Sequence, residues 1–228
     1  MVKILFEWLQ IEGYIGRSPA QRIKLPKQPR KLPAKGFSPE ELKMIFDGCD
    51  PNTVFGVRNR CLFELMYCTA ARRAEIAGMR LQHINHSNRT IFIDQGKGRK
   101  DGIVLYGNSA AYWLDRYLKY SRSHFQTVTS PDNLFITSRG KAFSPDTLGN
   151  LVRIELRKIG IYKEGAAHCF RHTFAIQMLE KGMDSRYISE FLRHESMKTT
   201  QRYLSLDVRH LRKPVSYTHL TLPTTSRV

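Results

Sequence analysis

His168-Cys169-Phe170-Arg171-His172 opens the stretch that decides the fold, and His194 and Tyr203 close it. The stretch contains imidazoles, a guanidinium and a phenol. Chemistry on a phosphodiester needs these groups, because cations clamp the phosphate oxygens, an imidazole handles a proton and a phenol is a nucleophile. His168 and Arg171 are three residues apart, so they share one face if the segment is helical. The stretch therefore predicts helices that carry a phosphate-handling site.

The composition indicates the same kind of partner. The chain has 228 residues, with 37 Lys and Arg against 20 Asp and Glu, a formal net charge of +17 and a pI near 10.0. An excess of this size predicts a polyanion, most often nucleic acid, although a ribosomal-type protein or a solubility surface would also be this basic. Hydrophobic residues make up 41%, which is enough for a packed core. No apolar run reaches the roughly 18–20 residues of a membrane span, so no membrane partner is predicted.

The pattern of prolines and charges divides the chain. Residues 1–13 predict a short helix, and residues 14–37 combine prolines with many Lys and Arg, which indicates an extended basic linker. Ser38-Pro39-Glu40-Glu41 then starts a helix, with Ser38 as its N-cap. The expected class is α+β, mainly α-helical with a small antiparallel three-stranded sheet. Apolar periodicity predicts further helices at 53–70, 108–122, 144–159, 167–181, 184–193 and 198–206, and strands near 83–85, 90–94 and 102–106.

The cysteines give no sign of a metal or redox motif. Cys49, Cys61, Cys68 and Cys169 lack C-x-x-C spacing and are expected to be reduced core thiols of a cytosolic protein. Zinc is the alternative interpretation of the cluster at residues 168–172, but the cluster has no second ligand pair of known spacing. No metal is therefore expected.

The last residues differ from the rest of the chain. Residues 215–224 are uncharged after a strongly basic sequence. They resemble the translation of a sequencing adapter, so we interpret residues 215–228 as read-through and exclude them from the fold. Natural coding sequence at the corresponding DNA would contradict this interpretation.

Four motifs follow one another along the chain. Residues 69–75 (TAARRAE) resemble T-G-x-R-x-x-E, 171–175 (RHTFA) resemble R-H-[ST]-F-A, 192–194 (LRH) resemble L-G-H, and 199–203 (TTQRY) resemble T-T-Q-x-Y. In this order they resemble the tyrosine recombinases, the phage integrase family, of the XerC/XerD-like site-specific kind. The resemblance covers about residues 38–206 and implies the DNA breaking-rejoining fold of that family's catalytic domain.

The resemblance carries the catalytic roles to six residues: Arg72, Lys97, His168, Arg171, His194 and Tyr203. Arg72 and Arg171 would clamp the phosphate, because a guanidinium fork binds two oxygens and stays charged. Glu75 would orient the Arg72 fork. Lys97 would protonate the leaving 5′ oxygen, and Tyr203 would be the nucleophile. Arg73 and Lys100 are alternatives to Arg72 and Lys97. A surface Arg-Glu pair and a half-buried helical tyrosine are the purely structural alternatives.

Arg193 departs from the family pattern, which has Gly at this position. Gly would allow a left-handed helix cap, whereas Arg in that conformation would cost roughly 1 kcal/mol. A further basic contact to DNA would compensate for this cost. The residues expected to bind DNA are Arg73, Arg99, Lys100, Lys27, Arg30, Lys31 and Arg193.

The resemblance also implies a mechanism and an organisation. Tyr203 would form a 3′-phosphotyrosine that a 5′ hydroxyl reverses, so no ATP, metal or other cofactor is expected. The partners would be double-stranded DNA and further protomers, four on two DNA sites, in a prokaryotic cytoplasm at the nucleoid. Residues 1–13 would be the remnant last helix of an N-terminal core-binding (SAM-like) domain, 14–37 the interdomain linker and 38–214 the catalytic domain. A catalytically silent DNA-binding remnant and a type IB-like topoisomerase are the alternatives.

Overall fold

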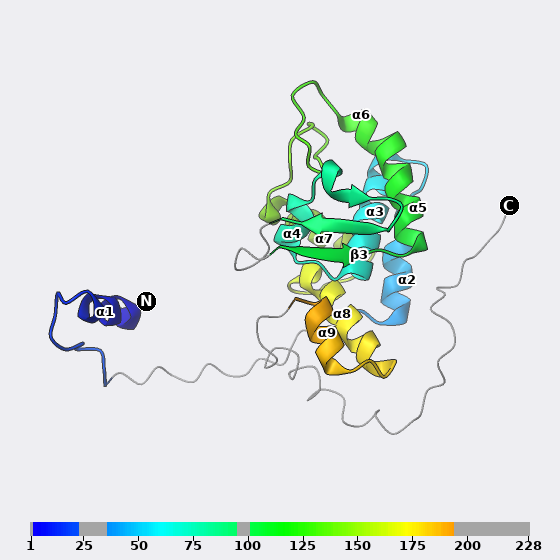
Figure 1. Ribbon diagram of the computed structural model, residues 1–228. Coiled ribbons are helices and arrows are strands. Elements are labelled where there is room, and N and C mark those ends of the chain that lie inside the picture. The colour runs from blue at the N-terminus through cyan, green and yellow to red at the C-terminus, as the bar shows by residue number, and fades with distance from the viewer. Residues whose placement is uncertain (1, 23–35, 95–100, 194–228) are drawn as a thin grey trace. The chain divides into compact units, whose positions relative to one another are not determined.

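The computed structural model describes residues 2–22, 36–94 and 101–193, and the chain divides into two units, Met1–Leu32 and Pro33–Val228 (Figure 1). The first unit contains helix α1 (Val2–Ile11), where the sequence predicts a helix. Most apolar side chains of α1 are solvent-exposed, Leu5 and Trp8 among them. The second unit contains the other described elements and the site.

The second unit is mainly helical, as expected. Its described helices are α2 (Pro39–Asp47), α3 (Val54–Thr69), α4 (Arg73–Gly78), α5 (Asn108–Arg116), α6 (Ser123–Phe125), α7 (Pro145–Lys158), α8 (Ala166–Glu180) and α9 (Ser185–Phe191), with a short 3₁₀ helix η1 (Leu81–His83). None of the helices in the described ranges is long and apolar enough to cross a bilayer.

Side-chain caps start several of these helices. Ser38 Oγ accepts the N–H of Glu41 at 3.2 Å, and Glu41 Oε2 accepts the N–H of Ser38 at 2.7 Å. This reciprocal pair is a capping box, and it confirms the predicted start of α2. Thr53 and Ser144 cap α3 and α7 with a single bond each, in which the side-chain oxygen accepts a backbone N–H.

The small sheet also matches the prediction. Strands β1 (Ile84–Asn85), β2 (Thr90–Ile93) and β3 (Gly102–Leu105) form an antiparallel sheet in the order β1-β2-β3. Ile91 pairs with Val104, and both are buried, whereas the neighbouring pair of Phe92 with Ile103 is exposed. This alternation buries one face of the sheet, as a period of two requires.

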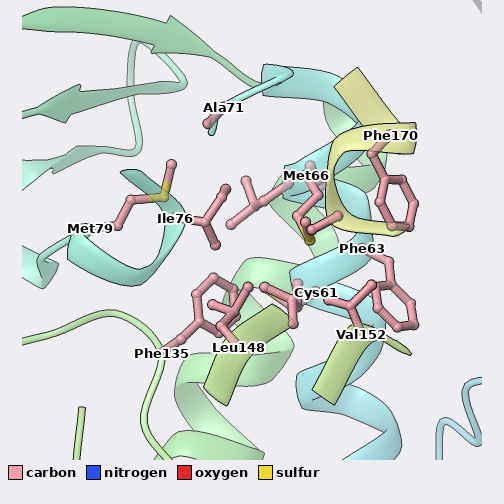
Figure 2. Packing of buried hydrophobic residues seen from close by; sticks show 14 of the residues in the cluster. Cys61, Phe63, Met66, Ala71, Ile76, Met79, Phe135, Leu148, Val152 and Phe170 are labelled. Carbon is pink, nitrogen blue, oxygen red and sulfur yellow. The ribbon is translucent and has the colours of Figure 1, made fainter. Parts of the chain in front are cut away.

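The core forms around the buried helix α3. Figure 2 shows side chains of α3 (Cys61, Phe63 and Met66) in one buried cluster with Ile76 of α4 and Phe170 of α8. The rings of Phe63 and Phe170 are stacked with centroids 5.6 Å apart. Because Phe170 is fixed in the core, the next residue of α8, Arg171, is held against the C-terminal end of α3.

One predicted helix changes type along its length. The sequence predicts a helix at 108–122, but α5 ends at Arg116 and a π-helix (η2, Tyr117–Arg122) follows it. Contacts distant in sequence account for the change. Ser121 Oγ donates to the carbonyl of Val54 at 2.6 Å, and the buried Arg122 guanidinium donates to the carbonyls of Pro131, Asn133 and Leu134.

Candidate active site

Arg72 lies in the short connection between α3 and α4. α3 ends at Ala70, which is in the left-handed region at φ 48°, and Arg72 is the N-cap of α4. Its Nη1 donates to Glu75 Oε1 at 2.9 Å, and its Nη2 donates to the carbonyl of Arg193 at 3.0 Å. The guanidinium therefore joins the start of α4 to the residue that follows α9.

Glu75 is the buried anion of the site. Its side chain is 4% exposed, and its carboxylate accepts three N–H groups. Nη1 of Arg72 reaches Oε1, whereas the backbone N–H of Arg72 and Nη2 of Arg193 both reach Oε2 at 2.6 Å. Burial raises the pKa of this carboxyl, but the hydrogen bonds and the charges of Arg193 and Arg72 outweigh it, and the pKa is lowered overall. Glu75 thus remains an anion that fixes the two guanidiniums.

Arg171 is the second guanidinium of the site and is itself buried. Its Nη1 donates to the carbonyl of Ala70 at 2.6 Å, and its Nη2 donates to the carbonyl of Leu192. These carbonyls stand at the ends of α3 and α9, where a helix leaves acceptors unsatisfied and a cation is favourable. Arg171 and Arg72 therefore bond to the consecutive carbonyls of Leu192 and Arg193.

His168 is in the first turn of α8 and is exposed. Together with Arg72, Arg73 and Glu75 it lines a pocket of about 390 Å³ that also borders the end of β2. Loss of hydration lowers the pKa of His168 below its ordinary value, and the positive charges of Arg73, Arg171 and Arg72 lower it further. At neutral pH the imidazole is therefore uncharged and can accept a proton.

Arg73 faces away from the Glu75 carboxylate. Its Nη2 lies 3.0 Å from Oδ1 of the exposed Asp146, in the first turn of α7. A Cβ at Gly149 would come within 2.7 Å of Arg73 Nη1, so glycine there leaves room for this side chain. Arg72 therefore bonds to Glu75, whereas Arg73 pairs with Asp146.

Arg193 has the left-handed backbone expected for the Gly of the motif, with φ 51°. Its side chain does not project toward solvent. It bonds to Glu75, and its Cδ and Nη1 lie over Gly102, the first residue of β3. The sequence gives no signal for this contact, because Glu75 and Arg193 are 118 positions apart. The same holds for the carbonyls of Ala70 and Leu192 that anchor Arg171.

The remaining predicted site residues lie outside the described ranges. Among the proposed catalytic residues these are Lys97, His194 and Tyr203, and among the proposed DNA contacts they are Arg99, Lys100, Lys27, Arg30 and Lys31. The structure thus brings together Arg72, Glu75, His168 and Arg171. Within the described ranges, no three His, Cys, Asp or Glu side chains are grouped as metal ligands would be.

Comparison with known proteins decides the family. The model of the phage integrase family matches residues 35–210. The chain belongs to the phage integrase family. It is 38% identical to tyrosine recombinase XerC 2 of Ralstonia nicotianae, over 96% of this chain and 62% of that relative, and 34% identical to tyrosine recombinase XerD of Lacticaseibacillus casei, over 96% and 73%. The first of these relatives is therefore considerably longer than the matched region.

Solved structures of this family have the same fold. The XerA recombinase matches with a TM-score of 0.68 and 29% identity, over 81% of this chain and 64% of that one. XerH bound to its palindromic difH substrate, in a post-cleavage complex, matches with a TM-score of 0.66 and 26% identity, over 79% and 52%. The mainly helical fold with a small antiparallel sheet is thus the recombinase catalytic fold, as the sequence predicts.

Proposed function

We propose that this chain is a site-specific DNA recombinase that cuts and rejoins DNA strands through a 3′-phosphotyrosine at Tyr203. The observation that carries the proposal is the convergence of Arg72, Arg171 and His168 where α3, α4, α8 and α9 meet. The net charge of +17 favours DNA as the partner. We further propose residues 38–214 as the catalytic domain, because the site is assembled from within this range.

The proposed chemistry conserves the energy of the phosphoester bond. The Tyr203 oxygen attacks the phosphorus, the bond to the 5′ oxygen breaks, and that oxygen leaves as a hydroxyl with a proton from Lys97. A 5′ hydroxyl from the partner strand then attacks the phosphotyrosine and restores the tyrosine. Because each step exchanges one phosphoester for another, the reaction needs no ATP, and the arginines take the charge-stabilising role that a metal ion would otherwise have.

Arg72 and Arg171 have the roles of phosphate clamps in this proposal. Guanidinium donors held in place before the substrate arrives stabilise the charge that develops on the non-bridging oxygens. His168, uncharged at neutral pH, accepts the tyrosine proton or bonds to the phosphate. Glu75 orients Arg72, and His194 is a further catalytic residue. Double-stranded DNA is the substrate, and four protomers on two DNA sites complete the exchange.

The test is covalent capture on a nicked suicide duplex, which loses a short fragment after cleavage and so traps the adduct. The whole chain and its Tyr203→Phe variant are incubated with random-sequence duplexes and separated on a denaturing gel. An adduct in the parent alone is the expected result, and sequencing the trapped DNA would identify the site. Tight, salt-sensitive binding without an adduct would overturn the catalytic proposal and leave a silent DNA-binding chain. Relaxation of supercoiled DNA without site preference would indicate a topoisomerase instead.

A further inference from the structure

Arg193 occupies a position that disfavours an arginine. Its φ of 51° lies in the left-handed region, where glycine is free of strain and a residue with a Cβ is not. Its side chain is also largely buried, at 19% exposure. Both features cost stability, so the side chain must contribute something that glycine would not.

Within the described residues, the Arg193 side chain bonds to Glu75. Nη2 of Arg193 donates to Glu75 Oε2 at 2.6 Å, beside the backbone N–H of Arg72, and Nη1 of Arg72 donates to the other oxygen, Oε1, at 2.9 Å. The carboxylate is therefore held at both oxygens by two guanidiniums. Arg193 adds a charged donor at Oε2 beside that N–H, which strengthens the hold on the carboxylate and so on the direction in which Glu75 keeps the Arg72 fork.

Strand β3 leaves space for this arrangement. A Cβ at Gly102 would lie 2.8 Å from Cδ of Arg193 and 3.1 Å from its Nη1. The first of these separations is closer than real Cβ atoms approach a neighbour, so any larger residue at Gly102 would push the Arg193 side chain away. Gly102 and Arg193, which are distant in the sequence, are thus compatible with this placement of the Arg193 guanidinium.

Stability alone does not account for this arginine. Nε and Nη1 of Arg193 are buried and find no hydrogen-bond acceptor within the described ranges. A buried cation with incomplete hydrogen bonding loses hydration that its ion pair only partly restores. Replacement by glycine would remove both this loss and the backbone strain.

We propose that Arg193 is a positioning residue for the phosphate clamp: it holds Glu75, and through Glu75 it sets the Arg72 guanidinium. The inference rests on the proposed role of Arg72. It gives Arg193 a function inside the site and not at the DNA surface. Gly102 contributes to the same function, because its missing Cβ leaves space for the Arg193 side chain.

The test combines three variants, Arg193→Gly, Gly102→Ala and the double variant, in single-turnover adduct formation. Arg193→Gly is expected to slow adduct formation roughly 10- to 100-fold, the effect of a misplaced catalytic group. The salt dependence of DNA binding should not fall. Gly102→Ala should slow the reaction in the parent but not further in the Arg193→Gly background. Gly107→Ala is the matched control, because a Cβ there would meet no atom within 4 Å.

Three outcomes would overturn the inference. The first is adduct formation at the parental rate in Arg193→Gly. The second is a decrease of about one in the slope of log binding constant against log salt concentration for this variant, which marks a lost phosphate contact. The third is a further slowing when Gly102→Ala is added to Arg193→Gly. A readout without DNA separates this inference from the proposed function. Titration of the Glu75 carboxyl by ¹³C NMR should give a higher pKa in Arg193→Gly than in the parent, because a neighbouring cation is lost. If the parent forms no adduct, the proposed function fails, and an unchanged Glu75 pKa would still refute the role of Arg193.

Discussion

Replacing Glu75 by glutamine tests whether the buried carboxylate holds the site together. The change keeps the shape of the side chain but removes its charge. The amide NH₂ of the glutamine must then face a guanidinium, donor against donor. Asp146→Asn is the matched control, because Asp146 also pairs with an arginine, Arg73, but is 86% exposed. The two variants therefore remove the same charge from a buried and from an exposed ion pair.

The expected cost follows from the burial of the pair. Removal of one partner of a buried ion pair costs roughly 3–5 kcal/mol, because the other charge is left uncompensated. Arg72 and Arg193 are 20% and 19% exposed, so water compensates them in part and the lower end applies, about 3 kcal/mol. For a domain of this size that corresponds to a fall in Tm of roughly 6–12 °C. Asp146→Asn should cost less than about 1 kcal/mol.

The effect of Glu75→Gln should depend on pH. The pKa of Glu75 in the folded protein is lowered below that of an unfolded chain, so the carboxylate stabilises the fold at pH values above the unfolded pKa of about 4.3. This contribution is lost as the pH falls through the lowered, folded-state pKa. The difference in stability between parent and variant should therefore be complete at pH 7 and should shrink steadily below about pH 4.3.

The assay is urea unfolding followed by circular dichroism, at pH values from neutral to acid, for the parent and both variants. A Glu75→Gln protein no less stable than Asp146→Asn at pH 7 would refute the reasoning. So would a stability difference that does not change with pH, since that would show a packing effect and not the loss of a charge.

Two further predictions concern the other groups of the site. Arg171→Ala should lower the free energy of unfolding by roughly 2–4 kcal/mol, because the carbonyls of Ala70 and Leu192 lose their donor. The control Arg153→Ala, at an exposed position, should change it by less than about 0.5 kcal/mol. Equal effects of the two variants in urea unfolding would contradict this role of Arg171. The Hε1 resonance of His168 should titrate with a midpoint below the ordinary pKa of a histidine. Adduct formation should decline as the pH falls below that midpoint, and this pH dependence should be lost in His168→Gln. A midpoint above the ordinary pKa would show that the neighbouring cations do not act on His168.

The sequence predicts the elements whose causes are local. The cap formed by Ser38, Pro39 and Glu41 lies within one turn, and it is present at the start of α2. The long apolar run at 53–70 predicts α3 because so many of its residues must be buried, and the alternation at 90–94 predicts β2. The π-helix of residues 117–122 has no local cause. Its Ser121 and Arg122 side chains donate to the carbonyls of Val54, Pro131, Asn133 and Leu134, which the fold brings to it.

The same distinction separates the parts of the candidate site. The pairing of Arg72 with Glu75 can be predicted, because an N-cap residue and an acid three positions later meet at the start of a helix. The left-handed backbone of Arg193 can be predicted from the glycine that the motif has there. The direction of the Arg193 side chain cannot, because it is set by Glu75 and by the missing Cβ of Gly102. A basic residue in a basic chain suggests a DNA contact, and only the fold shows the carboxylate beside it.

The arginines proposed to hold the phosphate also hold the fold. Arg171 joins the ends of α3 and α9, and Arg72 joins α4 to the residue after α9. A guanidinium has five N–H groups, and the bonds of Arg72 to Glu75 Oε1 and to the Arg193 carbonyl use two of them. Anchoring and phosphate binding are therefore compatible at Arg72, and the anchoring sets its orientation before DNA binds, which electrostatic catalysis requires. It follows that loss of activity in Arg171→Ala would combine a folding defect with a chemical one. Substitutions at Arg193 and Gly102 leave the donors of Arg72 and Arg171 in place, so their effect on the reaction reports the position of the clamp.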